Sequence, residues 1–165
     1  MPVKTLKVLL PQNADVQNVN INILPSSKRY LGSDFKLEYG KRQIPLSMKD
    51  ARSIKNAPNE TIYNSAEPYP KSIISNLGIQ KFRGYPVLIL NIYPVEYIPQ
   101  SGELYYFDKV DIRVNTVIKS NNFEPMFRGL QKDLYEVKGK VDNPEMVLQY
   151  KLPIDVSPTF SRSTL

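Results

Sequence analysis

The side chains that could do chemistry in this sequence are carboxylates, lysines, arginines and tyrosines, because the chain contains no histidine and no cysteine. That absence excludes imidazole bases, thiolate nucleophiles and Cys/His zinc sites. Acid–base catalysis by carboxylates needs two acids brought together by the fold. The acids in and around the most apolar part of the chain are Glu96, Glu103, Asp108 and Asp111. They form no local cluster, so we interpret them as solvated surface charges and expect no catalysis and no cofactor.

The basic residues are concentrated in one stretch. The chain has 22 Lys and Arg against 16 Asp and Glu, a formal net charge of +6, and residues 28–55 hold eight of these bases and three of these acids. Such a stretch can bind a polyanion, and Tyr30 and Tyr39 could stack on bases. No nucleic-acid-binding motif accompanies it, so we expect no nucleic-acid partner.

The most apolar part of the chain predicts an antiparallel hairpin. Residues 86–98 are rich in β-branched and aromatic types and predict one long strand. Pro94 cannot donate to a ladder and requires a sheet edge or an irregularity. Residues 99–102 have turn chemistry, and the alternation over 104–114 predicts the returning strand, with a bulge near Asp108.

Residues 83–106 combine an Arg-Gly pair, an apolar strand, a Pro-x-x-Tyr-x-Pro segment, a Gly-containing turn, and a strand with Leu and paired Tyr. The residues that form this pattern are Arg83, Gly84, Pro94, Tyr97, Pro99, Gly102, Leu104, Tyr105 and Tyr106. In this pattern the sequence resembles the propeptide domain of gingipain-type cysteine peptidases. The Arg-Gly pair is compatible with either a bulge or a turn. The resemblance implies a non-catalytic pro-domain that keeps a secreted or cell-surface cysteine peptidase latent and assists its folding.

The resemblance also implies which residue reaches the enzyme. Peptidases of this family are Arg- or Lys-directed, and their propeptides cover the active-site cleft and donate one basic residue to the specificity pocket. A guanidinium suits such a pocket because it pairs bidentately with a carboxylate. Counting from residues 44–45 and 62–63, which align with the family, indicates Arg52 as that residue. Lys49 and Lys55 flank it and are the alternatives; the other interpretation is that Arg52 is a solvated surface charge.

The rest of the chain predicts short strands and one helix. Fourteen prolines, seven glycines and eleven tyrosines favour an all-β class. Alternating apolar residues predict strands, which we place at 3–10, 18–23, 35–39 and 43–46. Residues 25–33 are predicted as a polar turn region and 47–71 as a long loop. The spacing of Phe127, Leu130, Leu134 and Val137 predicts one amphipathic helix near 126–138.

These elements predict one all-β domain over residues 1–141, an antiparallel, jelly-roll-like β-sandwich with one short C-terminal helix. Residues 142–165 are interpreted as a linker toward a downstream catalytic domain that this chain does not contain. Within the linker, Arg162, and less favourably Lys151, is a candidate for activation cleavage. No apolar run is long enough to cross a bilayer, so we expect no membrane insertion. The alternative function is a free-standing cell-surface β-sandwich module for binding or adhesion.

Overall fold

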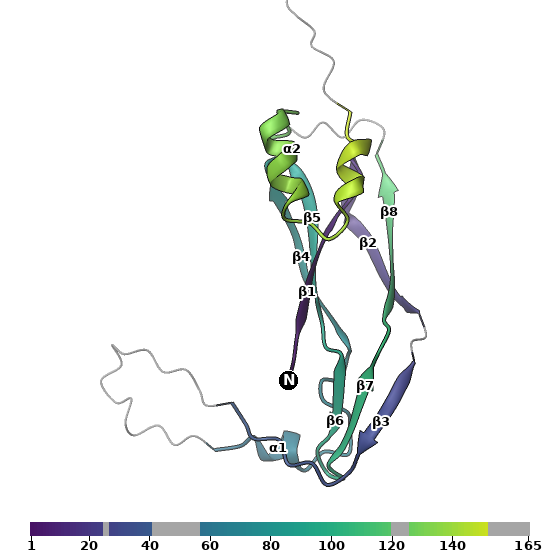
Figure 1. Cartoon of the computed structure of the whole chain (residues 1–165), viewed down its shortest axis with the longest axis vertical. Coiled ribbons are helices and arrows are strands. Elements are labelled where there is room, and N and C mark those ends of the chain that lie inside the picture. Colours follow the sequence, from purple (N-terminus) through teal and green to yellow (C-terminus); the bar gives the residue numbers. More distant parts are fainter. Residues whose placement is uncertain (25–26, 41–56, 120–125, 152–165) are drawn as a thin grey trace, which may run out of the picture. The chain divides into compact units, whose positions relative to one another are not determined.

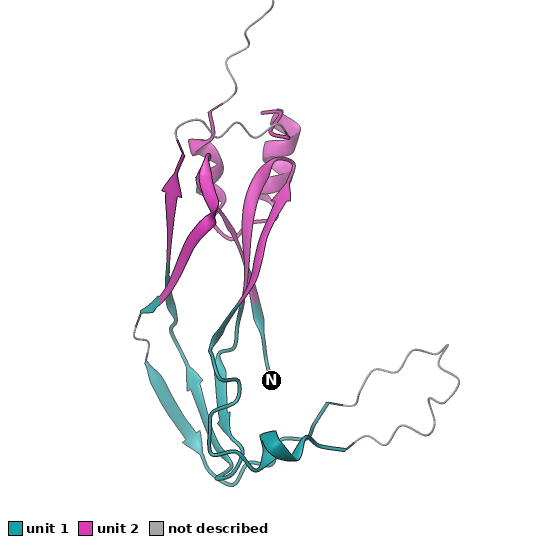
Figure 2. Cartoon of the chain, turned by 180° about the vertical axis from the view of Figure 1, so that it is seen from behind, with its two compact units in different colours: residues 1–4, 23–75, 91–113 teal, residues 5–22, 76–90, 114–165 magenta. Residues whose placement is uncertain are grey.

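The computed structural model describes residues 1–24, 27–40, 57–119 and 126–151 (Figure 1). The chain divides into two compact units (Figure 2). Unit 1 contains residues 1–4, 23–75 and 91–113, and unit 2 contains residues 5–22, 76–90 and 114–165. Strands β1, β2, β4, β5 and β8 contribute residues to both units.

Eight strands dominate the described residues. They are β1 (Lys4–Leu9), β2 (Ala14–Leu24), β3 (Lys28–Gly32), β4 (Ile74–Phe82), β5 (Tyr85–Ile92), β6 (Val95–Ile98), β7 (Glu103–Phe107) and β8 (Asp111–Ile118). The helices are α1 (Glu60–Tyr63), α2 (Gln131–Lys138) and the 3-10 helix η2 (Pro144–Gln149). The strands form three sheets, ordered β1-β5-β4, β2-β8 and β3-β7-β6. This confirms the predicted all-β, sandwich-like class, with α2 inside the range predicted for the C-terminal helix. In the part of the chain that is described, no helix is long and apolar enough to cross a membrane.

The predicted central hairpin is present, but both of its strands are interrupted. The single strand expected over 86–98 is wrong: β5 ends at Ile92 and β6 begins after Pro94, whose nitrogen has no hydrogen for a ladder. The turn at 99–102 is confirmed, with the Gly102 N–H donating to the Ile98 carbonyl at 2.9 Å. The returning strand is also divided, because β7 pairs with β6 and β8 pairs with β2.

The strand predicted at 35–39 is wrong, and so is the turn predicted over 25–33. Residues 28–32 form β3, which pairs antiparallel with β7 and sets Tyr30 opposite Tyr105, with ring centroids 5.3 Å apart. Cross-strand aromatic packing stabilises such a pair and overrides a local preference for turns. Residues 33–40 follow β3 without joining a sheet. The strand predicted at 43–46 lies outside the described residues.

The core of unit 2 is formed where α2 and η2 pack against β1 and β5. Its buried residues are Leu9, Tyr85, Val87, Val137 and Val147. The Tyr85 ring packs edge-on against Phe127, with centroids 5.1 Å apart, and lies 4.7 Å from the Tyr150 ring. Burial of each large apolar side chain stabilises the fold by roughly 1.5–3 kcal/mol, so this cluster accounts for the attachment of both helices to the strands.

Arg83 and Gly84 form the two-residue turn between β4 and β5. Of the two alternatives for the Arg-Gly pair, a bulge or a turn, the structure has the turn. Both residues have positive φ, 56° and 83°, as the tight turns of antiparallel hairpins require. A Cβ on Gly84 would lie 2.4 Å from the backbone N and Cα of Phe127. Only glycine therefore fits here, because the segment that precedes α2 packs directly on the turn.

The packed structure extends past residue 141, where the sequence analysis placed the end of the domain. The Lys7 N–H donates to the Asp142 carboxylate at 2.7 Å, and Asn143 exchanges two hydrogen bonds with the backbone of Leu9. Val147 is fully buried, and the Tyr150 hydroxyl donates to the Leu10 carbonyl at 2.6 Å. Residues 142–151 thus belong to unit 2; the remainder of the predicted linker lies outside the described residues.

Candidate functional site

The predicted site residues lie in two segments outside the described residues: Lys49, Arg52 and Lys55 in 41–56, and Arg162 in 152–165. The structure does describe both ends of the first segment, and both belong to unit 1. We call residues 34–40 the entry stem and residues 57–65 the exit stem. Their anchoring determines where the basic segment can be held.

The entry stem is fixed to the turn between β6 and β7. The Phe35 N–H donates to the Gly102 carbonyl at 3.0 Å, and the Tyr97 hydroxyl donates to the Phe35 carbonyl at 2.7 Å. Gly102 has a φ of +67°, and a Cβ there would lie 3.0 Å from the backbone of Asp34 and Phe35. The glycine of the predicted turn therefore serves two purposes: it allows the turn, and it lets the entry stem approach.

The exit stem is held by α1 and by a contact with the entry stem. Asn59 caps α1, its side-chain oxygen accepting from the Thr61 N–H at 3.1 Å. The Tyr63 hydroxyl donates to the Leu37 carbonyl at 2.9 Å and so joins the two stems directly. The Ser65 carbonyl accepts from the N–H of Gln100, in the β6–β7 turn, at 3.1 Å. Both stems are thus attached to the same hairpin.

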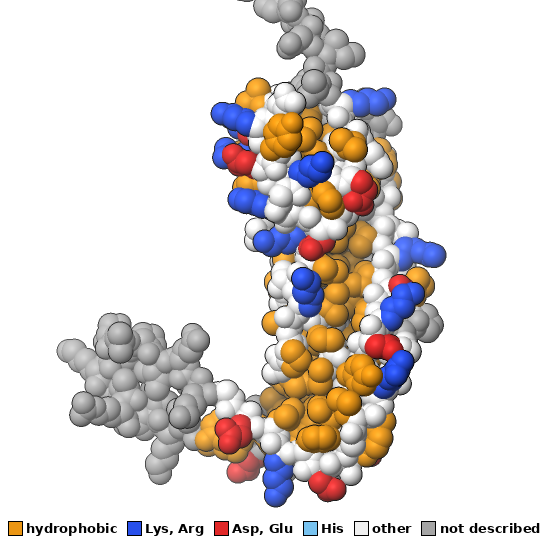
Figure 3. All heavy atoms as spheres, in the orientation of Figure 1, with side chains coloured by type: hydrophobic (Ala, Val, Ile, Leu, Met, Phe, Trp, Pro, Cys, Tyr) orange, Lys and Arg blue, Asp and Glu red, His pale blue; other side chains and the backbone are white. Residues whose placement is uncertain are grey.

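A groove with a volume of about 640 Å³ lies between the stems and the hairpin. Its described lining comes from residues 1–2, 37–40, Ala57, Asn59, Ile62 and Tyr63 of the exit stem, Tyr69, and Val95, Tyr97, Pro99 and Leu104 of the hairpin. We call it the stem groove. Tyr97 is buried in it, whereas Tyr39 and Tyr69 are 41% and 43% exposed. Hydrophobic side chains also gather over β6 and β7 on the face of unit 1 drawn in Figure 3. The site is therefore an aromatic concavity at the base of the basic segment.

Two of the bases in the charged stretch are neutralised within unit 1. Lys28 forms an ion pair with Glu96 and lies over the Tyr105 ring, 4.3 Å from its centroid. Arg29 lies 2.9 Å from Asp108. These contacts agree with interpreting Lys28 and Arg29 as structural charges rather than as a polyanion site. Most of the other basic residues of the stretch belong, by sequence, to segment 41–56 between the stems.

The fold does not bring together the four acids of the hairpin region, Glu96, Glu103, Asp108 and Asp111. Glu96 and Asp108 have the basic partners just described, Asp111 pairs with Lys109 at 2.9 Å, and Glu103 accepts from the Tyr105 hydroxyl at 3.2 Å. In the described ranges, no group of three or more acids is placed so that it could hold a metal ion. Glu96 is buried, so its interpretation as a solvated surface charge is wrong: its pairing with Lys28 makes it a structural charge. Glu103, Asp108 and Asp111 are at least partly exposed, and each has a partner.

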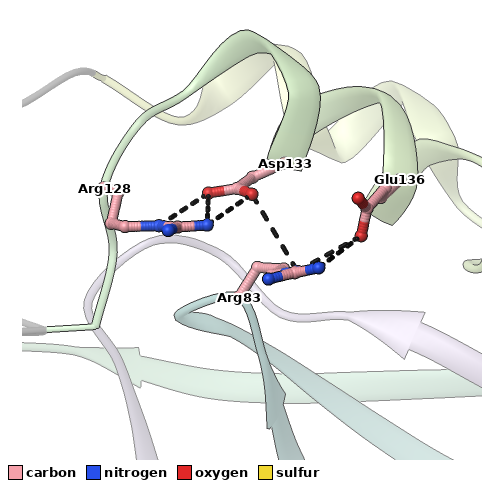
Figure 4. Close-up of polar contacts among 4 residues, drawn as sticks. All are labelled: Arg83, Arg128, Asp133 and Glu136. Carbon is pink, nitrogen blue, oxygen red and sulfur yellow. Dashed lines mark hydrogen bonds and ion pairs between the residues drawn. The ribbon is translucent and has the colours of Figure 1, made fainter.

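Unit 2 contains a buried charge that the sequence analysis missed. Asp133, on α2, is fully buried and accepts from Arg128 at 2.7, 2.8 and 3.0 Å. Arg83 lies 3.9 Å from Asp133 and pairs with Glu136 at 3.1 Å (Figure 4). We call these four residues the Asp133 cluster. Asp133 lies four residues before the buried Val137, so its position on the inward face of the helix could have indicated it.

A second acid of unit 2, Asp15, titrates below its ordinary range. Its carboxylate lies 3.0 Å from the Lys119 ammonium and accepts from the Asn18 amide at 2.6 Å. The bond with Lys119 is the largest cause, and the bond with Asn18 the next, that lower the pKa of Asp15 below its ordinary value of 3.8. This pair secures the start of β2 to the end of β8.

The fold and the site define a β-rich domain that holds a basic segment between two anchored stems. The chain belongs to the Propeptide_C25 family, whose model matches residues 1–132. The resemblance to the propeptides of gingipain-type cysteine peptidases is therefore confirmed. No curated protein matches the chain.

Two solved structures share the fold. One is a complex of the pro- and mature domains of RgpB from Porphyromonas gingivalis, with a TM-score of 0.64 and 16% identity over 87% of this chain and 70% of that one. The other, described as a structural insight into zymogenic latency of gingipain K from Porphyromonas gingivalis, has a TM-score of 0.52 and 17% identity over 72% of this chain and 65% of that one. At these identities the likeness extends to the fold alone.

Proposed function

We propose that this chain is the latency-maintaining pro-domain of a gingipain-type cysteine peptidase and that it inhibits the enzyme by occupying its active-site cleft with a basic residue of segment 41–56. The observation that carries the proposal is the family match over residues 1–132 combined with two stems anchored on one hairpin. The pro-domain contributes no catalytic group or cofactor; its partner is the catalytic domain of the peptidase.

The anchored stems support this mechanism through the entropy of binding. Both ends of the segment are joined to backbone that the β6–β7 hairpin holds in place. A segment tied at two fixed points has fewer conformations to lose when it enters a cleft, so more of the contact energy appears as affinity. Fixed stems therefore favour tight binding of the inhibitory segment to the enzyme.

Arg52 is the residue that we assign to the specificity pocket. Its guanidinium can pair bidentately with a pocket carboxylate, whereas a Lys ammonium interacts with the carboxylate as a point charge. Lys49 and Lys55 are the alternatives in the same segment. Arg162 is the proposed activation junction, where cleavage would separate this domain from a downstream catalytic domain. The domain would act outside the cell or at its surface and would also assist folding of the enzyme.

The test is a titration of the catalytic domain of the cognate peptidase with the purified chain, with residual activity as the measurement. We expect inhibition by the wild type and, for Arg52→Ala, a loss of affinity of about 30-fold or more, the size expected for a buried anchor at an interface. Arg113→Ala, which removes an exposed arginine of the same unit from β8, is the matched control. No inhibition by the wild type would refute the function, and a large loss in Lys49→Ala or Lys55→Ala instead would move the assignment to that residue.

A further inference from the structure

The stem groove borders segment 41–56, and this position limits which molecule can cover the groove. Its lining includes Gly40 and Ala57, the described residues that border segment 41–56. Arg52 precedes Ala57 by five residues, and five residues of polypeptide span at most about 18 Å. A protein that binds the Arg52 side chain must therefore approach the groove to within about this distance.

The distance between Arg52 and the groove can be compared with the size of a protein interface. A standard interface covers about 800 Å² on each partner, which corresponds to a patch with a radius of about 16 Å. An interface centred on Arg52 would thus reach the groove wherever the two lie within about 16 Å of each other, which is most of the range that five residues allow. The approach from Gly40 is less constrained, because Arg52 lies twelve positions after it in the sequence.

The chemistry of the groove selects a neutral, apolar group. Among the described lining residues, Glu38 has the only charged side chain; most of the others are aliphatic or aromatic. The Tyr63 and Tyr97 hydroxyls donate to backbone carbonyls inside unit 1, so their rings present mainly carbon to the groove. Tyrosines around a concavity are typical of the residues that dominate binding energy at protein interfaces.

We propose that the stem groove receives an aliphatic or aromatic side chain of the peptidase catalytic domain, presented by the surface that borders its specificity pocket. This proposal rests on the proposed function and adds a second point of attachment to it. Arg52 provides the charged contact, and the groove provides a hydrophobic contact that does not depend on charge. The enzyme is then held both inside its cleft and beside it.

The test measures the affinity of the full chain for the catalytic domain of the cognate peptidase by calorimetry. Tyr39→Asp puts a charge at the rim of the groove, and Ala57→Trp fills the groove from an exposed position without removing any contact of the fold. We expect both to bind about tenfold or more weakly, a typical loss for a buried interface residue. Tyr39→Phe is expected to stay within about twofold of the wild type, because the proposed contact uses the ring.

Tyr135→Asp is the matched control, because Tyr135 is an exposed tyrosine (64%) on α2 of unit 2. We expect it to leave the affinity unchanged. If Tyr39→Asp and Ala57→Trp bind like the wild type while Arg52→Ala does not, the groove proposal is overturned and the proposed function stands. If the wild-type chain does not bind the catalytic domain, both fall. A lowered melting temperature for Tyr39→Asp with full affinity for Ala57→Trp would show that the groove is filled by this chain itself, which also overturns the proposal.

Discussion

Removing Arg128 should destabilise the chain more than neutralising Asp133, although both substitutions break the same ion pair. In Arg128→Ala the fully buried Asp133 carboxylate keeps, among the described residues, Arg83 at 3.9 Å as its basic partner. Leaving a buried charge without its partner costs about 3–5 kcal/mol, and the remaining contact with Arg83 brings our expectation to about 3 kcal/mol. In Asp133→Asn the charge left behind is the Arg128 side chain, which is 47% exposed and can be hydrated. The loss is then that of charge-assisted hydrogen bonds, about 2 kcal/mol.

The double variant separates these two causes. Arg128→Ala together with Asp133→Asn leaves no buried charge, so it should cost about 2 kcal/mol, less than Arg128→Ala alone. The coupling energy between the two positions is then about 3 kcal/mol, at the upper end for residues in direct contact. The assay is urea unfolding at neutral pH followed by circular dichroism. Lys132→Ala, an exposed position on α2, is the control and should change the stability by less than about 0.5 kcal/mol. Costs that simply add in the double variant would refute the buried-charge explanation.

Three further outcomes follow from unit 2. Gly84→Ala should destabilise the chain by more than about 2 kcal/mol in the same urea assay, because it combines a positive φ with a backbone clash; a neutral effect would contradict the turn geometry. Deleting residues 142–165 should lower the melting temperature, since Val147 is fully buried; an unchanged melting temperature would contradict the packing of residues 142–151 in unit 2. The lowered pKa of Asp15 means that its pairing with Lys119 stabilises the fold above about pH 4 and that this contribution is lost as the pH falls through the folded-state pKa. Asp15→Asn should therefore show a shallower loss of stability below about pH 4, and an unchanged acid profile would exclude this pair as a cause.

The sequence indicated the class of the fold and most of the hairpin because those features have local causes. Alternation and turn chemistry specify β5, β6, β7 and their connection, and Pro94 indicated a sheet edge or an irregularity at the point where β5 and β6 are interrupted. Helix α2 followed from apolar spacing and from Gly139 at its end. These patterns express contacts between residues close in sequence, which a single sequence contains.

What the sequence could not indicate depends on distant partners. Residues 35–39 alternate like a strand, but β3 pairs with β7 through Tyr30 and Tyr105, and Leu37 and Tyr39 of the entry stem line the stem groove instead. The Arg-Gly pair matches the family pattern in sequence, but the sequence alone does not indicate which residues the pair contacts. Arg83 joins the Asp133 cluster, and Gly84 admits the segment before α2, two contacts made across about 50 and 43 positions of sequence. Such contacts exist only once the chain has folded.

The candidate inhibitory residues came from the family resemblance, and the structure adds the anchored stems around them. Arg52, Lys49 and Lys55 remain predictions, as does cleavage at Arg162. The stems and the groove were not predicted, because Tyr63, Tyr97 and Gly102 act through hydrogen bonds and close approaches to backbone far along the chain.

The most direct test of the proposed function is a crystal structure of this chain bound to the catalytic domain of its cognate peptidase. We predict the Arg52 guanidinium in the specificity pocket, paired with a carboxylate, while the stems remain attached to the β6–β7 hairpin. A specificity pocket that contains no side chain from residues 41–56 would contradict it.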